Sequence, residues 1–291
     1  MKGIGITTTD MKRLLVSFSG GKTSAYMAIC IKQNYADQYD EVITVFANTG
    51  QEKQETLDFV NKVDKAYDLN VVWLESSPNN DERKSSGFSI VSYETASIDG
   101  LPFERVIQKY GIPNKSYPHC TRELKINPIH NYARSIGWEA KTYDTAIGIR
   151  SDEMDRINPK HKEQGFIYPL VFSYPKTKQD IEEFWAKQPF TLNIKEHEGN
   201  CTWCWKKADR KLYRLVKENP SIFNFPMEME RKYGNQENGK AVFFRNHRST
   251  EDVLKDAMRY VDIDSLQMDM FEGLDVQADC KDSCEADDGA I

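Results

Sequence analysis

Strand and helix patterns alternate through the first quarter of this 291-residue chain. Apolar runs at residues 13–19, 41–47 and 71–74 predict buried strands, and segments at about 23–33 and 52–67, with apolar side chains at helical spacing, predict helices between them. Consecutive parallel strands need such crossover helices, whereas antiparallel strands do not. The alternation therefore predicts an α/β fold in which helices cover both faces of a parallel sheet.

The rest of the chain extends this pattern and then changes character. A helix is predicted at 122–136 and a fourth strand at 142–149, after a polar segment at 76–100 that we expect to form a long loop. Beyond about residue 176 we expect a mostly helical region, with helices at 178–187, 205–219 and 250–260. The chain is thus expected to have three parts, an α/β domain (1–175), a helical region (176–261) and a flexible acidic tail (262–291).

Formal charge is distributed unevenly along the chain. The whole sequence carries −6 at pH 7, but residues 262–291 hold ten acidic side chains and one lysine, which gives this tail −9 and leaves the rest at +3. A mildly basic body is compatible with an anionic partner such as nucleic acid. Basic side chains at near-helical spacing would form either a contact face for it or an ordinary solvated helix face: Lys206, Lys207, Arg210, Lys211, Arg214 and Lys217.

The sequence favours a cytoplasmic protein. Its longest apolar run, around residues 25–31, is far shorter than the roughly 20 residues that span a bilayer. The first residues lack the sustained apolar stretch of a signal peptide. We therefore expect no membrane partner, and no disulfide framework among the six cysteines.

A glycine-rich segment lies between the first strand and the first helix. Residues 17–24 read Ser-Phe-Ser-Gly-Gly-Lys-Thr-Ser. Glycines let backbone N–H groups turn toward an anion, a helix N-terminus adds partial positive charge, and Lys22 and the hydroxyls complete a phosphate cradle. A Walker A loop would need glycine in place of Val16, so the γ-phosphate chemistry of kinases and motors is disfavoured.

The pattern Ser-x-Gly-Gly-Lys-x-Ser after the first strand resembles the PP-loop of the ATP pyrophosphatase and phosphoadenosine phosphosulfate (PAPS) reductase superfamily. Members have a Rossmann-like fold of the adenine nucleotide alpha hydrolase type, and they cleave ATP between the α and β phosphates or bind an adenylylated sulfate. The family usually has aspartate after the lysine, where this chain has Thr23. The resemblance implies an ATP and Mg²⁺ site formed by Ser17, Ser19, Gly20, Gly21, Lys22, Thr23 and Ser24.

A second segment resembles the same superfamily at the end of the second strand. Ala47, Asn48 and Thr49 occupy the place where the family closes over the adenosine. This position agrees with the rule that ligands bind at the carboxyl ends of parallel strands.

A third segment follows the fourth strand, where residues 147–153 resemble the family's Gly-Ile-Arg-x-Asp-Glu. The resemblance implies that Gly148 belongs to the nucleotide site and that Arg150 contacts the phosphates or the second substrate. Asp152 and Glu153 could hold Mg²⁺ or orient the loop, and they would equally suit an ordinary helix N-terminus. The expected catalytic residues are Lys22, Arg150 and Asp152.

Three of the cysteines form a candidate metal site. Cys201 and Cys204 make a CxxC with basic neighbours, and Cys120 begins a segment similar to the superfamily's Cys-x-Arg-x-x-Lys-x-x-Pro. The resemblance to assimilatory adenylylsulfate reductases implies a 4Fe–4S cluster on these three thiolates, with His119 or an exogenous ligand on the fourth iron. Three cysteines and one histidine would also suit zinc, and free buried thiols are the third alternative.

Arg122 and Lys125 follow Cys120 and could bind phosphate or the acceptor. The two cysteines of the acidic tail, Cys280 and Cys284, are expected to be inert, because the surrounding carboxylates should raise the pKa of their thiols.

Three functions remain open at this point. The first is an ATP-dependent transferase that adenylates an acceptor and completes sulfur insertion, similar to the sulfurtransferases of nucleic-acid modification, including DNA phosphorothioation. Its sulfur donor would be a protein such as a cysteine desulfurase. The second is a PAPS or adenylylsulfate reductase, and the third is a non-catalytic nucleotide-binding regulator. The intact Gly20-Gly21-Lys22 favours the first, because reductases of this class commonly lose the second glycine and the lysine.

Overall fold

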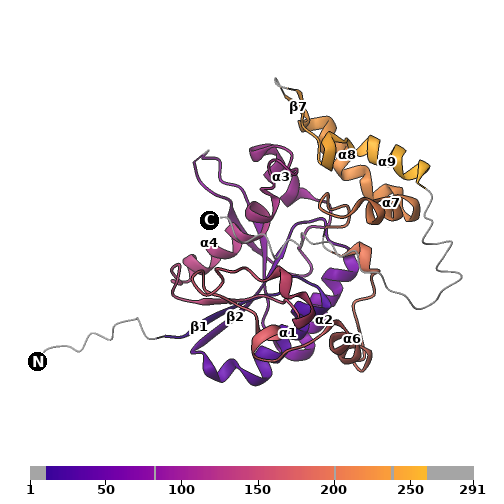
Figure 1. Cartoon of the computed structure of the whole chain (residues 1–291). Helices are drawn as coiled ribbons and strands as arrows, with labels where there is room; N and C mark the ends of the chain where they lie inside the picture. The colour runs from indigo at the N-terminus through magenta and orange to yellow at the C-terminus, as the bar shows by residue number, and fades with distance from the viewer. Residues whose placement is uncertain (1–10, 82, 200, 237–238, 261–291) are drawn as a thin grey trace, which may run out of the picture.

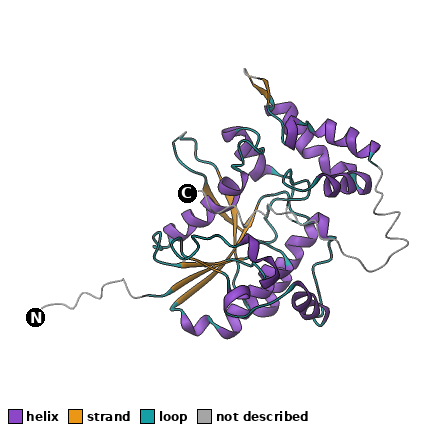
Figure 2. Ribbon diagram, viewed as in Figure 1, coloured by secondary structure: helices purple, strands orange, loops and turns teal. Residues whose placement is uncertain are grey.

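The computed structural model describes residues 11–260 of the chain except 82, 200, 237 and 238. A twisted sheet lies at its centre (Figures 1 and 2). This sheet has six strands in the order β4-β3-β2-β1-β5-β6. The strands are β1 (Arg13–Ser17), β2 (Glu41–Asn48), β3 (Val72–Ser77), β4 (Gly87–Val91), β5 (Asp144–Ala146) and β6 (Phe166–Ile167). A separate two-stranded sheet is formed by β7 (Asn235–Gln236) and β8 (Gly239–Lys240).

The predicted parallel sheet is confirmed for five strands and corrected for β4. All pairings in the main sheet are parallel except that of β3 with β4, which is antiparallel. β4 lies inside the segment 76–100 that was expected to be a loop. It follows β3 through residues 78–86, whose described part contains no helix, and an antiparallel return needs no crossover helix. Its side chains are half-buried or exposed, as suits an edge strand, so no apolar run marks it in the sequence.

The helices cover both faces of the main sheet, as predicted. Side chains alternate along β1, so that Leu14 and Val16 join the core under α1, α2 and α6, whereas Leu15 joins the opposite core under α4. The helices are α1 (Lys22–Asn34), α2 (Gln54–Tyr67), α3 (Leu101–Tyr110), α4 (Asn127–Ser135), α5 (Pro169–Phe172), α6 (Lys178–Ala186), α7 (Asp209–Glu218), α8 (Asn224–Tyr233) and α9 (Thr250–Arg259).

The helices predicted at 23–33, 52–67, 178–187 and 250–260 are confirmed to within two residues. The helix predicted at 122–136 is divided into a π-helical turn, η2 (Arg122–Ile126), and α4. The one predicted at 205–219 begins only at Asp209, because the chain before it forms the CxxC turn. The fourth predicted strand is short: β5 ends at Ala146, and the residues after it form a loop.

The C-terminal helices form a second apolar core. Side chains of α7, α8 and α9 pack with α3 and with the CxxC segment, and Figure 1 shows these three helices grouped beyond α3, away from α1 and α2. α6 packs instead on α1 and α2. The three predicted parts of the chain stay a prediction, and the acidic tail with Cys280 and Cys284 lies outside the described residues. Within the described part, none of the helices combines the length and apolarity needed to cross a membrane.

The strand order creates a crevice beside β1. The chain runs from β1 to β2 and β3 in one direction, and β5 then pairs on the other side of β1. The loops that follow β1 and β5 therefore lie side by side at one edge of the sheet, where the β5 loop meets the start of α1. Open α/β sheets bind ligands at this kind of point, at the carboxyl ends of the strands.

Candidate functional site

The phosphate loop leads directly into the N-terminus of α1. Gly21 is the N-cap, no side chain caps its N–H groups, and the first turn of α1 contains no acidic residue. The hydroxyl of Ser24 donates to the carbonyl of Gly21 at 3.1 Å and accepts from the backbone N–H of Ser19 at 3.2 Å, so these residues fix the shape of the turn. The first N–H groups of α1 thus remain available to an anion.

The backbone conformation and the close packing of the loop require a glycine at position 20. Its φ of +86° is a conformation that L side chains rarely adopt, and a Cβ there would lie 2.7 Å from Cγ2 of Thr56 on α2. The loop is therefore pressed against α2, and a glycine is the residue that permits it.

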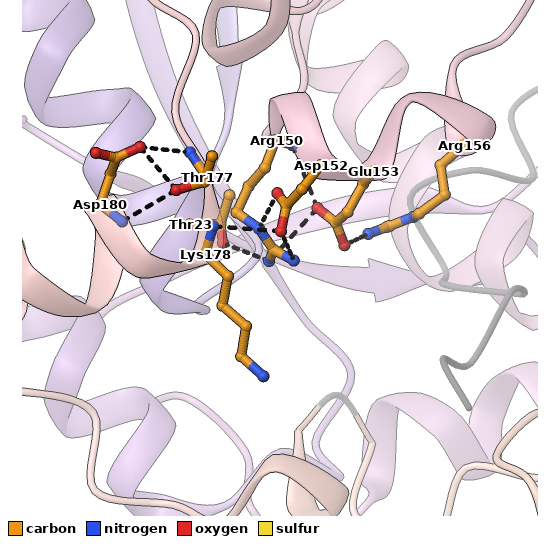
Figure 3. Close-up of polar contacts among 8 residues, drawn as sticks. All are labelled: Thr23, Arg150, Asp152, Glu153, Arg156, Thr177, Lys178 and Asp180. Atoms are coloured by element: carbon orange, nitrogen blue, oxygen red, sulfur yellow. Dashed lines mark hydrogen bonds and ion pairs between the residues drawn. The ribbon is translucent and has the colours of Figure 1, made fainter. Parts of the chain in front are cut away.

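The loop after β5 packs against the first turn of α1. A Cβ on Gly148 would lie 2.9 Å from Cα of Ser24, so the two backbones touch. Two residues on, Arg150 Nη1 lies 3.4 Å from Oγ1 of Thr23 (Figure 3). The structure thus brings together Ser17–Ser24, Gly148 and Arg150, which the sequence places more than 120 residues apart.

Carboxylates hold Arg150 in position. Its Nε donates to Oδ1 of Asp152 at 2.9 Å, and its Nη1 lies 3.5 Å from Oε2 of Glu153, as Figure 3 shows. Asp152 also accepts from the backbone N–H of Lys178 at 3.3 Å, and Glu153 pairs with Arg156. Burial raises the pKa of Asp152, but the hydrogen bonds from Arg150 and Lys178 outweigh it and lower this pKa below its ordinary value. The two acids therefore orient the guanidinium.

Helix α6 supplies part of the site that the sequence did not predict. Nζ of Lys22 pairs with Oε2 of Glu182 at 2.6 Å, and Nε1 of Trp185 donates to the carbonyl of Lys22 at 3.0 Å. The resulting cleft has a volume of about 320 Å³. Its charged lining residues are Lys22, Arg150, Glu153, Lys178, Glu182 and Lys195. No local motif marks Lys178, Glu182 or Lys195, because they reach the cleft through tertiary packing.

The segment at the end of β2 is buried. The amide of Asn48 donates to Oε1 of Glu75 at 2.7 Å and to the carbonyl of Ser97 at 2.8 Å. The backbone N–H and hydroxyl of Thr49 both donate to Oε2 of Glu52, at 2.9 and 2.8 Å. Ala47 is buried as well. These side chains shape the loop, and their hydrogen-bonding groups are used within the protein.

The three predicted cysteine ligands line one small cavity. Cys120, Cys201 and Cys204 are each at most 8% exposed and surround a space of about 20 Å³, which is room for about one water-sized atom. None of them forms a disulfide. Sγ of Cys201 lies 3.3 Å from Oγ1 of Thr49, and Lys125 also lines the cavity.

His119 lies outside the lining of this cavity. Its ring packs beside those of Tyr110 and Tyr117, and Nδ1 lies 3.1 Å from the carbonyl oxygen of Tyr117. Burial lowers the pKa of His119 to about 4. Its neighbour Arg122 donates through Nε to the buried Glu123 at 2.9 Å. The structure therefore does not bring His119 to the cavity as a fourth ligand.

As arranged, these residues do not complete a ligand set for the implied metals. A 4Fe–4S cluster needs four ligands and much more room than one atom, and structural zinc needs four ligands. Among the residues that the structure describes, no three His, Cys, Asp or Glu side chains are arranged to hold a metal ion.

The basic residues after the CxxC do not form one solvated face. Lys206 and Lys207 are buried. Nζ of Lys207 donates to the carbonyls of Gly199, Cys201 and Thr202 at 2.7 to 3.0 Å. Lys207 thus stabilises the CxxC turn, a role that the spacing of the basic residues in the sequence does not indicate.

The CxxC segment contacts the loop after β2 and also reaches the cleft. The carbonyl of Gln51 accepts from the N–H and hydroxyl of Thr202, at 3.0 and 3.1 Å, and Nε1 of Trp203 donates to the side chain of Gln51. Toward the cleft, Gly199 is part of the cleft lining, whereas Cys201 lines the cavity. The two sites are therefore neighbours.

Known proteins resemble the chain in sequence. Residues 13–99 match the phosphoadenosine phosphosulfate reductase domain. The nin region protein ORF290 of Escherichia phage lambda is 32% identical over 287 residues, which cover 95% of this chain and 96% of that protein. MJ0973 of Methanocaldococcus jannaschii is 24% identical over 228 residues, which cover 76% of this chain and 48% of that longer protein. Among solved structures, the phosphoadenylyl-sulfate reductase of Candida auris in its phosphate complex is 16% identical, with a TM-score of 0.37 over 62% of this chain and 74% of that one.

Proposed function

Because the chain belongs to the PP-loop superfamily of nucleotide-using enzymes that includes the PAPS reductase domain, we propose that it binds ATP and adenylates an acceptor. In this proposal an oxygen of the acceptor attacks the α-phosphorus, the bond to the β-phosphate breaks, and pyrophosphate leaves. The acceptor oxygen then carries AMP. A sulfur nucleophile can replace this oxygen, which leaves as part of AMP.

One observation carries the proposal: an intact Gly20-Gly21-Lys22 turn at the uncapped N-terminus of α1 faces Arg150 across a basic cleft. A helix N-terminus and convergent cations together favour a group with several negative charges. The β and γ phosphates of ATP present such a group.

The residues of the cleft have separate roles in this proposal. Backbone N–H groups at the start of α1 bind the leaving phosphates, and Ser19 and Ser24 hold the turn that presents them. Lys22 and Arg150 neutralise the charge that develops on the pyrophosphate. Asp152 positions Arg150. Mg²⁺, when bound with ATP, would add further neutralisation of the phosphates.

The cysteine cavity supports the sulfur-transfer part of the proposal. Three buried thiols lie next to the loop that ends β2, and a donor protein such as a cysteine desulfurase would supply their sulfur. We derive no step through a cluster, because the cavity in its present form does not fit one. Anaerobic purification with metal analysis tests this: chains without iron would support a thiol site, and four irons per chain would mean that the cavity opens around a cluster.

The acceptor that we propose is a nucleic acid, and support for it comes from the charge of +3 outside the acidic tail. Truncation after residue 261 removes the tail. It should strengthen nucleic-acid binding if the tail competes for the basic surface, and an absence of nucleic-acid binding by both forms at low salt would argue against this acceptor.

The product of ATP turnover tests the proposed chemistry. With Mg²⁺, ATP and an acceptor nucleic acid, we expect one pyrophosphate released for each AMP that becomes bound to the acceptor. ADP and phosphate would contradict the proposal. Sulfite formed from adenylylsulfate and a thiol reductant would favour a reductase, the activity named for the domain that residues 13–99 match. Nucleotide binding without turnover would favour a regulator.

A further inference from the structure

We propose that Glu182 of α6 makes the cleft selective for a magnesium-bound nucleotide over a metal-free one. This inference rests on the proposed function and names the form of substrate that the same site takes. It concerns a residue that no motif in the sequence marks.

Helix α6 holds Glu182 over the phosphate loop. Nε1 of Trp185 donates to the carbonyl of Lys22 at 3.0 Å, and the indole is buried against Phe59 with ring centroids 4.8 Å apart. Residues three apart on a helix share a face, so Glu182 points the same way as Trp185. Its Oε2 lies 2.6 Å from Nζ of Lys22, and its side chain remains half-exposed toward the cleft.

The carboxylate that pairs with the loop lysine thus comes from another helix. Position 23 is an uncharged threonine, and the first turn of α1 holds no acidic residue. The other two acids near the cleft are engaged elsewhere: Asp152 accepts from Arg150 and from the N–H of Lys178, and Glu153 pairs with Arg156. Glu182 is therefore the acid that an incoming phosphate group meets at Lys22.

This placement has opposite effects on the two forms of a nucleotide. A metal-free phosphate must displace Glu182 from Lys22 and approaches a like charge, which weakens its binding. A nucleotide that carries Mg²⁺ offers the carboxylate a cation with a strong preference for oxygen ligands, while Lys22 remains close to the phosphates. Glu182 would then be a ligand of this Mg²⁺.

The inference also separates two substrate classes. ATP in its magnesium complex has a diphosphate tail beyond the α-phosphorus, where Lys22 and Glu182 lie in this proposal. An adenylylated sulfate lacks that tail and is expected to gain little from Mg²⁺. The cleft should therefore prefer magnesium-bound ATP over adenylylsulfate.

Calorimetric titration with ATP, in Mg²⁺ and in EDTA, tests the inference without any turnover. For the wild type we expect Mg²⁺ to increase ATP affinity at least about tenfold. In Glu182→Gln we expect this increase to fall to about twofold or less, because the variant binds metal-free ATP more tightly and magnesium-bound ATP less tightly than the wild type does. Glu183→Gln is the matched control on the same helix, since Glu183 is exposed and accepts from Gln179 at 2.9 Å. It should behave as the wild type.

The outcomes distinguish this inference from the function on which it rests. If Glu182→Gln keeps the full effect of Mg²⁺ on ATP affinity, the inference is wrong and ATP binding stands. If the wild type binds no ATP in either condition, the proposed function fails and the inference with it. Glu182→Asp keeps the negative charge and should keep most of the effect of Mg²⁺ on ATP affinity. This variant shows whether the result for Glu182→Gln comes from the lost charge or from disturbed packing of α6.

Discussion

The cleft and the cysteine cavity are neighbours, but different interactions stabilise them. The cleft is open, with a volume of about 320 Å³, and its residues are held by ion pairs such as Lys22–Glu182 and Arg150–Asp152. The cavity is about 20 Å³, and aromatic rings surround its buried thiols, with Trp203 stacked on Phe103 at 5.3 Å between centroids. Ion pairs can be exchanged for a charged ligand, whereas apolar packing excludes water and charge. Under the proposed function, this difference would let phosphate binding and sulfur transfer take place in separate environments.

The segment that contains Gly199 and the CxxC links the two regions, because Gly199 lines the cleft and Cys201 lines the cavity. The loop after β2 contacts the same segment through Gln51 and Thr49. Because partly exposed ion pairs hold the cleft and buried packing holds the cavity, replacing charged residues of the cleft should act mainly on function, and changes around the cavity mainly on stability.

The largest expected effect comes from Lys22→Ala. Loss of this charge should lower the rate of pyrophosphate release at least about 100-fold. The melting temperature should hardly change, because the Lys22–Glu182 pair is partly exposed and such pairs contribute about 0–1 kcal/mol. Lys32→Ala, which removes an exposed lysine of the same helix paired with Asp68, is the control and should retain activity. A fully active Lys22→Ala would place the phosphates elsewhere.

Gly148→Ala, at the contact between the β5 loop and α1 beside the cleft, should lower both the stability of the protein and its affinity for ATP. The new Cβ would lie 2.9 Å from Cα of Ser24, and backbone cannot rotate out of the way. We expect a loss of about 1–3 kcal/mol in the free energy of unfolding, together with weaker ATP binding. Gly21→Ala is the stability control, since its Cβ would meet nothing nearer than Oγ of Ser19 at 3.9 Å. Equal unfolding curves for the two variants would contradict the close approach of the β5 loop and α1.

Acid should destabilise the region around the cavity through His119. Burial lowers the pKa of His119 to about 4, below its ordinary value of about 6.5, so the unfolded chain binds more protons as pH falls through this window. This stability is present above pH 6.5 and is lost as pH drops toward 4. We expect the free energy of unfolding to fall by about 1–2 kcal/mol between pH 7 and pH 5 from this group. Denaturant titrations of His119→Gln should lack that part of the pH dependence, and an identical pH profile would show that the ring is not buried.

The smallest expected effect is that of Thr49→Val. It removes the hydroxyl that donates to Glu52 and contacts Cys201, at a cost of about 1 kcal/mol. Thr49→Ser retains the hydroxyl and should remain within about 0.5 kcal/mol of the wild type. ATP affinity should be the same in both variants. A large loss of ATP affinity in Thr49→Val would mean that the two regions are coupled more tightly than their contacts indicate.

Local patterns in the sequence predicted the parts of the fold that local forces determine. β1 and β2 are apolar runs in the sequence. The two adjacent glycines mark the phosphate loop, and Gly20 has the positive φ that favours glycine. β4 was missed because an exposed edge strand needs little apolar surface. α8 was missed too, since its apolar residues face a core made by distant helices.

The candidate site was predictable where a motif carries the chemistry and not where packing does. The sequence placed Lys22, Arg150 and the three cysteines in candidate sites, and the structure brings each set together. It could not reveal the contact of Lys22 with Glu182, 160 positions away, or the burial of Lys207 under the CxxC turn. Pairing over such distances depends on how α6 and the CxxC segment dock.

A crystal structure with Mg²⁺ and α,β-methylene-ATP, which cannot be cleaved at the α–β bond, tests the central claim most directly. The account predicts that the β and γ phosphates lie at the N-terminus of α1 between Lys22 and Arg150, with the metal near Glu182. A nucleotide bound outside this cleft, or with its phosphates directed away from Gly20 and Gly21, would contradict it.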